Sequence, residues 1–235
     1  MSAAQQKANA ALAALDLVES GMTLGLGSGS TAELFVKALG EALAKGDLES
    51  VRGVPTSEAT AQLAQDVGVP LVPVDHVQCI DLTVDGADEV DFQFRLIKGG
   101  GACLLREKII ANASDLMAVV IDETKLVREL GAYPLPVEVD PFAFTITAKK
   151  VFDALRASGV KSPDVTLRRK GDGLDPLLTD GSNYILDCAC DRIPDAEEAA
   201  ERLSSIPGVV EHGLFINLAR VLVMGEDEGA KVIEA

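Results

Sequence analysis

The first half of this chain alternates short segments rich in β-branched residues with longer segments of helical periodicity. The pattern predicts helices at residues 4–19, 31–44, 58–67 and 102–113, and strands at 23–26, 51–54, 71–74, 82–85 and 117–121. Strands separated by helices pair in parallel through right-handed crossovers, which place helices on both faces of the sheet. The sequence therefore predicts an α/β fold with a doubly wound, mostly parallel, Rossmann-like sheet.

The pattern changes after about residue 130, where prolines become frequent. It predicts a strand at 137–139, a helix at 145–157, strands at 165–169 and 184–188, a helix at 195–205 and a strand at 209–216. This β-α-β-β-α-β order is typical of a small ferredoxin-like α+β unit. The apolar run at 220–224 is expected to return to the main sheet. We expect a main catalytic domain of residues 1–130 plus 209–235, with the smaller domain inserted at 131–208.

Composition narrows the classes of partner. Lys and Arg number 21 against 37 Asp and Glu, and the formal net charge of −16 leaves no basic face for a nucleic acid. No apolar run reaches the roughly 18 residues that span a bilayer, and the N-terminus lacks a signal-peptide pattern. The four cysteines lack paired CxxC spacing, so reduced thiols are expected. We expect a cytoplasmic protein without a nucleic-acid or membrane partner, whose acidity serves solubility or reflects a salty habitat.

Ligands of open parallel sheets bind outside the carboxyl ends of the strands, so the loops after the strands carry the candidate site. The loop at 25–31 opens a helix, and its N–H groups with the hydroxyls of Ser30 and Thr31 suit a phosphate. Residues 27–32 also match the G-x-G-x-x-A dinucleotide fingerprint, but Thr56 and Ser57 stand where its ribose-binding acid is expected. The lysine that a P-loop requires does not follow these glycines, so the segment does not match that motif. A glycine turn that only permits close packing remains an alternative.

The loop at residues 85–91 places Asp85, Asp88, Glu89 and Asp91 within seven positions. A turn needs only the first of these acids and the glycine after it, so the others suggest a proton-relay pair or a divalent metal site. Because the spacing lacks the alternate ligands and terminal glutamate of a calcium loop, no metal is expected. In the preceding loop, Ser57 is expected to be a helix N-cap.

A third stretch places a cation, a bare backbone and a carboxylate close together as Lys98, Gly99–Gly101 and Glu107. The glycines leave N–H groups open at the start of the predicted helix, where the macrodipole attracts anions. Glu107 shares a helical face with Cys103 and Ile110, which predicts a half-buried carboxyl whose pKa is raised by desolvation and lowered by Lys98. Such a group can act as a general base; a surface glutamate on a core helix is the alternative.

A fourth loop, residues 122–125, adds Lys125 at the same edge, and Lys7 is a further cation. His76 and His212 have no partner in the sequence pattern and are expected to be structural. These groups favour proton abstraction next to a carbonyl, with the oxyanion held by N–H groups and a cation. A phosphorylated aldose fits, because one carboxylate can move a proton between C2 and C1 without a cofactor.

Four spaced motifs carry a resemblance to a known family: GSGST at 27–31, DGAD at 85–88, KGGG with RE at 98–107, and PGVV with GLF at 207–215. Over residues 4–225 the chain resembles type A ribose-5-phosphate isomerase. The resemblance implies interconversion of ribose 5-phosphate and ribulose 5-phosphate through an enediolate, in the non-oxidative pentose phosphate pathway. It also implies a homodimer or a dimer of dimers, with neither cofactor nor metal.

The resemblance implies roles for individual residues. Glu107 corresponds to the general base, and Asp85 to the residue that assists opening of the sugar ring. Lys98 with the adjacent glycines corresponds to the group that stabilises the enediolate, with Asp88 as a support. The implied substrate-binding residues are Ser28, Gly29, Ser30, Thr31, Gly86, Ala87, Gly99, Gly100, Gly101 and Lys125, with Lys7 as a weaker phosphate candidate. The family often has Thr where this chain has Ser28, and the hydroxyl is kept.

Three alternatives remain within the sequence analysis. A related sugar-phosphate isomerase acting on an amino sugar needs a group that manages ammonia release, and no clear sign of one is present. A CoA-transferase-like enzyme needs a glutamate nucleophile with room for a long cofactor. A non-catalytic sugar-phosphate sensor could keep Ser30, Thr31 and Lys125, but has no reason to keep Glu107 together with Asp85.

Overall fold

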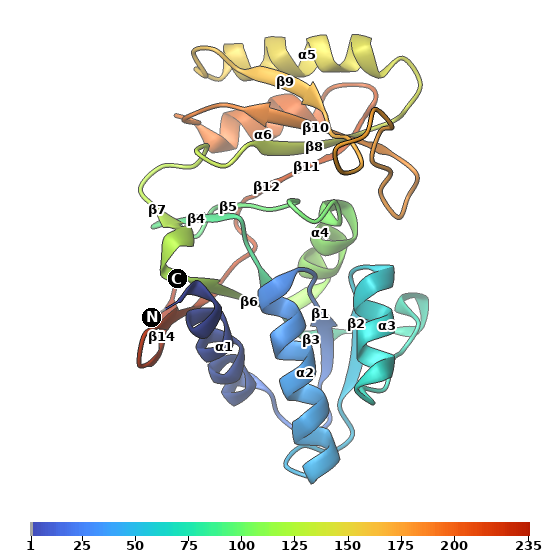
Figure 1. Cartoon of the computed structure of the whole chain (residues 1–235), viewed down its shortest axis with the longest axis vertical. Helices are drawn as coiled ribbons and strands as arrows, with labels where there is room; N and C mark the ends of the chain where they lie inside the picture. The colour runs from blue at the N-terminus through green and yellow to red at the C-terminus, as the bar shows by residue number, and fades with distance from the viewer. Residues whose placement is uncertain (1) are drawn as a thin grey trace. The chain divides into compact units, whose positions relative to one another are not determined.

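The computed structural model describes residues 2–235, which form two compact units (Figure 1). Unit 1 consists of residues 2–87, 106–126 and 217–235, and unit 2 consists of residues 88–105 and 127–216. Residues 88–105 and 209–216, which the sequence analysis placed in the main domain, therefore fall in unit 2. The predicted domain bounds themselves stay a prediction.

The central sheet of unit 1 has six strands in the order β14-β13-β6-β3-β1-β2. All neighbours pair in parallel except β14, which pairs antiparallel with β13. The strands are β1 (Thr23–Leu26), β2 (Arg52–Pro55), β3 (Ile80–Gly86), β6 (Ser114–Asp122), β13 (Val221–Glu226) and β14 (Gly229–Glu234). The chain reverses its direction of progress between β1 and β3, so the carboxyl ends of these two strands flank the expected ligand crevice.

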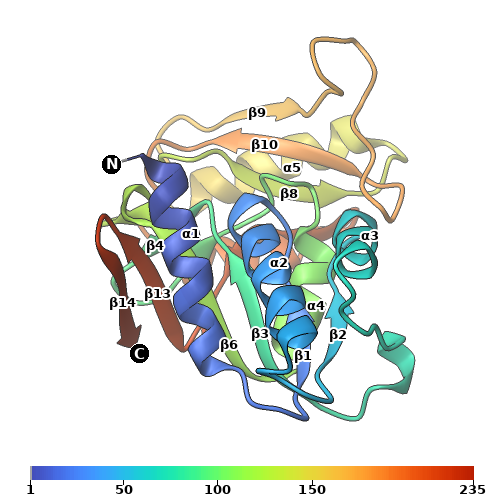
Figure 2. The same ribbon diagram turned by 60° about the horizontal axis from the view of Figure 1, so that its bottom comes forward.

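Helices cover both faces of this sheet, which confirms the doubly wound fold (Figure 2). The helices are α1 (Ala3–Ala14), α2 (Ser30–Lys45), α3 (Glu58–Asp66) and α4 (Leu104–Asn112), with short 3-10 helices η1 (Leu15–Leu17), η2 (Val74–His76) and η3 (Glu123–Lys125). On one face, Phe35 of α2 lies in a fully buried cluster with Leu24 of β1 and Leu82 of β3. On the other face, Ile110 of α4 packs with Val54 and Ile80.

Unit 2 contains a four-stranded antiparallel sheet in the order β11-β8-β10-β9. Its elements are β8 (Leu135–Val139), α5 (Phe144–Ala157), β9 (Asp164–Leu167), β10 (Tyr184–Ala189), α6 (Ala196–Ser204) and β11 (Val209–His212). Numbered along the chain, the strand order is 4-1-3-2, so the predicted ferredoxin-like unit is confirmed. Val137, Val151 and Leu203 are fully buried in its core.

A third, small sheet has the order β12-β5-β4-β7, and the sequence analysis missed it. Its strands are β4 (Glu89–Asp91), β5 (Leu96–Ile97), β7 (Leu126–Val127) and β12 (Leu214–Phe215). Segments of two or three residues are too short to show a period of two, so residue alternation cannot predict them. The sequence analysis also missed β14, which returns along β13 after the tight turn at Asp227 and Glu228.

The strand predicted at 71–74 is wrong. Leu71 makes a single bridge to Gly53, and Val74–His76 forms a 3-10 helix instead. Pro70 and Pro73 flank the segment, and a proline has no backbone N–H to donate to a strand ladder.

Two predicted elements differ in their bounds from those observed, each for a local reason. The helix predicted from residue 102 begins at Leu104, because Ala102 has a φ of 60°, outside the helical region. The strand predicted at 209–216 is divided at Gly213, where a Cβ would lie 2.3 Å from the carbonyl oxygen of Lys98. Among the described residues, no helix combines the length and the apolar content that a membrane crossing requires.

Gly225 in β13 lies directly against the backbone of α1. A Cβ at this position would lie 1.8 Å from the carbonyl oxygen of Gln6, so Gly225→Ala must push α1 away from the sheet. We expect the free energy of unfolding to fall by about 1–3 kcal/mol, measured by denaturant titration. Val232→Ala on the half-exposed strand β14 is the control, with an expected change within about 0.5 kcal/mol. Equal losses in the two variants would contradict the close contact.

Candidate active site

Gly25 in β1 and Gly27, directly after it, make room for side chains of the neighbouring strand β3. A Cβ at Gly25 would lie 2.0 Å from Oγ1 of Thr83, and a Cβ at Gly27 would lie 2.2 Å from Oδ1 of Asp85. Thr83 and Asp85 are both fully buried. The glycines therefore let a polar side chain and a carboxylate lie across β1, on the same face of the sheet.

Asp85 is held in place by the loops around it. Its Oδ1 accepts hydrogen bonds from the N–H of Ser28 at 3.1 Å and from the N–H of Gly86 at 2.7 Å. The carboxylate thus ties the loop after β1 to the end of β3. Ala87, also predicted to bind substrate, follows directly and is half-buried.

Glu107 lies on the same face of the sheet as Asp85. A Cβ at Gly25 would lie 2.7 Å from Cγ2 of Ile110, so α4 packs against the face toward which Thr83 and Asp85 project. The chain leaves α4 for Ser114, which pairs with the first residue of β3, so α4 runs opposite to the strands. Glu107 precedes Ile110 by nearly one turn and is therefore nearer the carboxyl ends of the strands. It is 4% exposed, more deeply buried than the half-buried position expected.

The hydroxyl of Ser28 belongs to a cluster of hydroxyl groups. It lies 2.8 Å from both Oγ1 of Thr56 and Oγ of Ser57, and 3.0 Å from Oγ1 of Thr60. Ser57 accepts a hydrogen bond from the N–H of Thr60, which confirms the predicted N-cap of α3. Thr56 and Ser57, which stand where a dinucleotide fingerprint has its acid, thus orient the loop after β1 through their hydroxyl contacts with Ser28.

The amino end of α2 brings together three of the predicted phosphate-binding residues. Its N-cap, Gly29, has a φ of 92° and no side chain to cap the first turn. Nζ of Lys7, on α1, donates a hydrogen bond of 3.0 Å to Oγ of Ser30, the first residue of α2. Thr31 follows and is 8% exposed. A cation, a hydroxyl and the positive end of a helix dipole therefore meet at one place, as an anion requires.

Lys125 lies at the end of η3, directly after the carboxyl end of β6. The neighbouring Glu123 accepts a hydrogen bond of 2.7 Å from Nε2 of Gln6 on α1. Since Gln6 precedes Lys7, helix α1 connects η3 with the start of α2. Unit 1 thus holds both predicted phosphate-binding lysines on segments joined by hydrogen bonds.

In unit 2, Lys98 follows β5 directly and is 3% exposed. Its Nζ lies 5.6 Å from the ring centroid of Phe215 in β12, a cation–π arrangement. The N–H of Lys98 also donates to the carbonyl of Gly213 at 2.9 Å. The pairing of β5 with β12 therefore fixes both the backbone and the ammonium group of this lysine.

The glycine loop that follows is held by Asp88. The N–H of Gly100 donates a hydrogen bond of 2.8 Å to Oδ2 of Asp88, and the N–H of Asp88 donates to the carbonyl of Ile97 at 2.8 Å. Gly99 has a φ of 112° and closes a turn in which the N–H of Ala102 donates to its carbonyl. One of the three predicted N–H donors of this loop is therefore used within the protein.

The other two acids of the 85–91 loop have structural roles. Glu89 accepts hydrogen bonds from the N–H groups of Gly131, at 2.7 Å, and Tyr133, at 2.5 Å. Asp91 forms a salt bridge of 2.6 Å with Arg95 and closes the turn between β4 and β5. Glu89 and Asp91 therefore stabilise the local backbone, which leaves Asp85 and Asp88 as the acids of this loop predicted to take part in the reaction.

Comparison with known proteins supplies the family. The sequence model of Ribose 5-phosphate isomerase A (phosphoriboisomerase A) matches residues 52–229. The chain is 67% identical over 234 residues to ribose-5-phosphate isomerase A of Maricaulis maris (strain MCS10), with 100% of both chains covered. It is 51% identical over 235 residues to the protein of the same name from Agrobacterium fabrum (strain C58 / ATCC 33970), again with 100% of both covered. The chain belongs to the ribose-5-phosphate isomerase A family.

Solved structures of this family share the fold over the whole chain. A D-ribose-5-phosphate isomerase in complex with phospho-erythronic acid is 38% identical, with a TM-score of 0.93 and 100% of both chains covered. Ribose 5-phosphate isomerase A from Methanocaldococcus jannaschii is 37% identical, with a TM-score of 0.90 and the same coverage. The type A isomerase resemblance inferred from four motifs is therefore confirmed.

Two residues, one aromatic and one charged, contact the predicted isomerase loop and escaped the sequence analysis as individual residues. Phe215 lies under Lys98, and the GLF motif contains it without showing which side chain it meets. Arg168 donates hydrogen bonds to the carbonyls of Gly99 and Gly100. No spacing links residue 168 to the glycine loop, because the contact depends on how β9 lies in the folded sheet.

The two histidines of this isomerase family member lie outside these groups. His212 is buried, and its Nε2 lies 3.0 Å from Oγ of Ser204 while its Nδ1 accepts from the N–H of Leu214. This is the structural role expected of it. His76 is exposed in η2.

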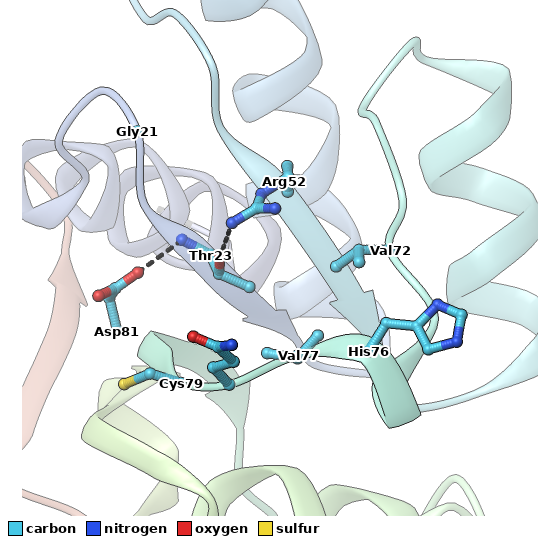
Figure 3. A pocket seen from close by; sticks show the side chains of 9 residues that line it. Gly21, Thr23, Arg52, Val72, His76, Val77, Cys79 and Asp81 are labelled. Atoms are coloured by element: carbon cyan, nitrogen blue, oxygen red, sulfur yellow. Dashed lines mark hydrogen bonds between the residues drawn. The ribbon is translucent and has the colours of Figure 1, made fainter.

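A cavity of about 450 Å³ opens at the opposite edge of the unit 1 sheet, by the amino ends of the strands (Figure 3). Thr23 and Arg52, the first residues of β1 and β2, line it together with Asp81. Nη2 of Arg52 donates to Oγ1 of Thr23 at 3.1 Å, and the N–H of Thr23 donates to Oδ2 of Asp81 at 2.7 Å. The cavity is thus separate from the carboxyl ends of the strands, toward which Asp85 and Glu107 of unit 1 lie.

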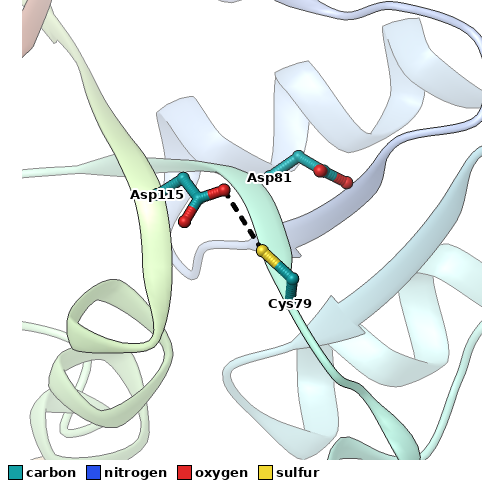
Figure 4. Close-up of side chains that lie close together, drawn as sticks. All are labelled: Cys79, Asp81 and Asp115. Carbon is teal, nitrogen blue, oxygen red and sulfur yellow. Dashed lines mark hydrogen bonds between the residues drawn. The ribbon is translucent and has the colours of Figure 1, made fainter.

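Beside this cavity, the potential ligand atoms of Cys79, Asp81 and Asp115 lie within 4.8 Å of one another (Figure 4). Sγ of Cys79 donates a hydrogen bond of 3.2 Å to Oδ2 of Asp115. This hydrogen bond and the charges of Asp115 and Asp81 raise the pKa of the Cys79 thiol. The protonated thiol itself accounts for the close approach of the carboxylate.

Of the three cysteines of unit 2, Cys103 is half-buried, and Cys188 and Cys190 are buried. Burial raises the pKa of Cys188 well above its usual value, and it raises the pKa of Cys190 to about 12. Both thiols therefore stay protonated and unreactive at neutral pH.

We expect Asp115→Asn to speed the alkylation of Cys79 by iodoacetamide at pH 8. The substitution removes the negative charge and replaces the carboxylate by a neutral amide, whose oxygen is a weaker acceptor and whose NH2 can donate to the thiolate, so the thiolate fraction rises. Labelling of the Cys79 peptide is followed by mass spectrometry, with the buried Cys188 as an internal slow control. An unchanged or slower rate for Cys79 would contradict the assignment of the pKa shift to Asp115.

Proposed function

We propose that the protein interconverts ribose 5-phosphate and ribulose 5-phosphate, with Glu107 as the general base. The observation that carries the proposal is the burial of Glu107 and Asp85 on one face of the unit 1 sheet, toward the carboxyl ends of its strands. Two buried carboxyl groups at a ligand-binding edge require a chemical purpose, since burial of a charge is costly. Proton transfer at a sugar carbon provides one.

The reaction moves two protons, from C2 to C1 and from O2 to O1, and needs no electron acceptor. Glu107 removes the proton from C2 of the open-chain aldose, and the C–H electrons form the C1–C2 double bond while O1 takes the negative charge. The carboxylic acid then returns the proton to C1, and the O2 proton passes to O1 as the C2 carbonyl forms. Asp85 assists the preceding step, the opening of the furanose ring. It accepts the proton of the anomeric hydroxyl as the C1–O4 bond breaks and the C1 carbonyl forms, and O4 takes up a proton.

Lys98 and the glycine loop stabilise the enediolate in this proposal. The Lys98 backbone is held by its hydrogen bond to Gly213, and its ammonium group lies over the Phe215 ring, so the charge is positioned before the substrate arrives and little reorganisation is needed. Asp88 supports the loop through its hydrogen bond to the N–H of Gly100.

The phosphate is bound by the loop Ser28–Thr31 with Lys7 and Lys125. The contact of Lys7 with Ser30 supports this part of the proposal. Phosphate binding far from C1 and C2 supplies energy that holds the reacting carbons in place. The remaining residues of the proposed substrate-binding set are Gly86, Ala87, Gly99, Gly100 and Gly101.

The proposal includes a cytoplasmic location and a homodimer or a dimer of dimers as the working assembly. Four free thiols suit a reducing compartment. Light scattering of the purified protein measures the assembly directly.

Replacement of the base tests the proposal. Glu107→Gln keeps the shape of the side chain and removes the proton acceptor, so we expect kcat to fall by at least about 10²–10⁴-fold. Affinity for phospho-erythronic acid should change little. The control is Glu41→Gln, an exposed residue paired with Lys45, which should keep full activity.

The same assay in deuterated water tests the chemistry. With wild-type protein and ribose 5-phosphate, deuterium should appear at C1 of the ribulose 5-phosphate formed. Absence of turnover with ribose 5-phosphate would overturn the proposed function. Near-normal turnover by the Glu107→Gln variant would remove only the base from its role.

A second variant tests the oxyanion site. Lys98→Ala should raise the barrier to turnover by about 2–4 kcal/mol, seen as a lower kcat, because the lost charge acts on the enediolate. Lys45→Ala, in an exposed ion pair with Glu41, is the matched control and should leave kcat unchanged. An increase in KM with unchanged kcat would move Lys98 to ground-state binding.

A further inference from the structure

Arg168 lies just after β9 in unit 2, and its guanidinium group makes four hydrogen bonds. Nε and Nη2 donate to the two carboxylate oxygens of Asp187 on β10, in a fork-to-fork pair. Nη1 donates to the carbonyl of Gly99 at 2.9 Å and to the carbonyl of Gly100 at 3.0 Å. The side chain is only 13% exposed. An arginine from the ferredoxin-like sheet thus binds the backbone of the glycine loop.

These contacts fix the direction of two successive peptide groups. The described residues contain no cis peptide bond, and in a trans peptide the C=O and N–H groups point to opposite sides. The peptide between Gly99 and Gly100 is held at both ends, by Arg168 at its carbonyl and by Asp88 at its N–H. The next peptide has its carbonyl on Arg168, so the N–H of Gly101 points away from Arg168.

The loop leaves little freedom at its centre. A Cβ at Gly100 would lie 2.6 Å from Oη of Tyr133 and 2.7 Å from Oδ1 of Asp88, so any larger residue would displace the carboxylate that holds the loop. Gly99 is buried, whereas Gly101 is exposed. Of the three glycines, Gly101 therefore presents its N–H from an exposed position with a direction set by the protein.

The charge of Arg168 is compensated within unit 2. Burial alone lowers the pKa of the guanidinium, but the hydrogen bonds and charge of Asp187 outweigh burial and leave the pKa raised. The group is therefore a rigid, always charged donor whose charge is matched by Asp187. This suits a role in holding a backbone better than a role in attracting a second phosphate.

We propose that Arg168, oriented by Asp187, is a positioning residue for the isomerisation: it holds the carbonyls of Gly99 and Gly100 so that the N–H of Gly101 donates to the enediolate oxygen. This inference rests on the proposed function of the glycine loop. It adds a residue that does not touch the sugar and names the loop N–H that does. The alternative is that Arg168 only stabilises the ferredoxin-like sheet.

The test compares Arg168→Met and Arg168→Lys with the wild type. A misplaced donor costs about 10²-fold in rate, so we expect kcat for ribose 5-phosphate to fall by about that factor in Arg168→Met, with KM within about two-fold. Arg168→Lys keeps the charge and loses the fork, and it should not restore kcat. Full activity in Arg168→Lys would overturn the positioning role.

The matched control is Arg192→Met. Arg192 also pairs with a carboxylate in unit 2, Glu129, but its side chain is 74% exposed, and its Nε and Nη2 both donate to that carboxylate. We expect wild-type kcat in this variant. A loss equal to that of Arg168→Met would assign the effect to unit 2 stability.

Two further measurements keep the inference testable if Arg168→Met folds poorly. Asp187→Asn leaves Arg168 in place and loosens the fork, and we expect a smaller fall in kcat at an unchanged melting temperature. Hydrogen–deuterium exchange of the peptide that covers residues 98–104 should speed up in both variants, and an unchanged exchange rate would overturn the inference.

If the wild type neither turns over ribose 5-phosphate nor binds phospho-erythronic acid, the proposed function fails. If the wild type does both and Arg168→Met has the same kcat, this inference alone fails.

Discussion

The close approach of Gly25 in β1 and of Gly27 directly after it to strand β3 is the constraint on which unit 1 depends. With any larger residue at Gly27, the carboxyl group of Asp85 could not lie across β1 and accept the N–H of Ser28. The same absence of a side chain at Gly25 admits Ile110, which sets the depth of α4 and hence of Glu107. The packing of the sheet and the placement of both proposed proton carriers therefore have one cause. A glycine-rich strand end that looks like a nucleotide-binding fingerprint serves here to bury carboxylates.

Anion binding by this chain must overcome its own field. The formal net charge is −16, so a phosphate approaches a molecule that repels it at long range. Only local geometry can reverse this. Lys7 reaches Ser30 at the amino end of α2, and Gln6 ties the same helix to the segment that carries Lys125. The cations are few and exposed to salt screening, so the proposed affinity depends on the hydroxyl and N–H groups as much as on charge.

Much of the fold and of the site could be predicted from the sequence because both depend on local patterns. The α/β alternation, the ferredoxin-like unit and the Ser57 N-cap all follow from periodicity and residue type. The four glycine and acid motifs identified the family in the same way. The third sheet could not be predicted, since its strands are too short to show a period. The strand predicted at 71–74 was wrong because the prediction gave too little weight to the two prolines that flank and interrupt the segment. The contacts of Arg168 and Phe215 join residues distant in sequence, and a single sequence holds no signal for such pairs.

In unit 2, hydrogen bonds from charged side chains hold the segment 88–105, whose strands are too short to form long hydrogen-bond ladders. Glu89 binds the backbone at residues 131 and 133, Asp91 closes the β4–β5 turn, and Asp88 and Arg168 hold the glycine loop from both sides. Each of these groups gives up hydration, which apolar packing would not require, so they add specificity of conformation more than stability. The loop that we propose presents an N–H to the enediolate oxygen needs one conformation. Asp88 and Arg168 bond directly to its backbone and impose that conformation, whereas apolar contacts to three glycines could not, because glycine has no side chain to pack.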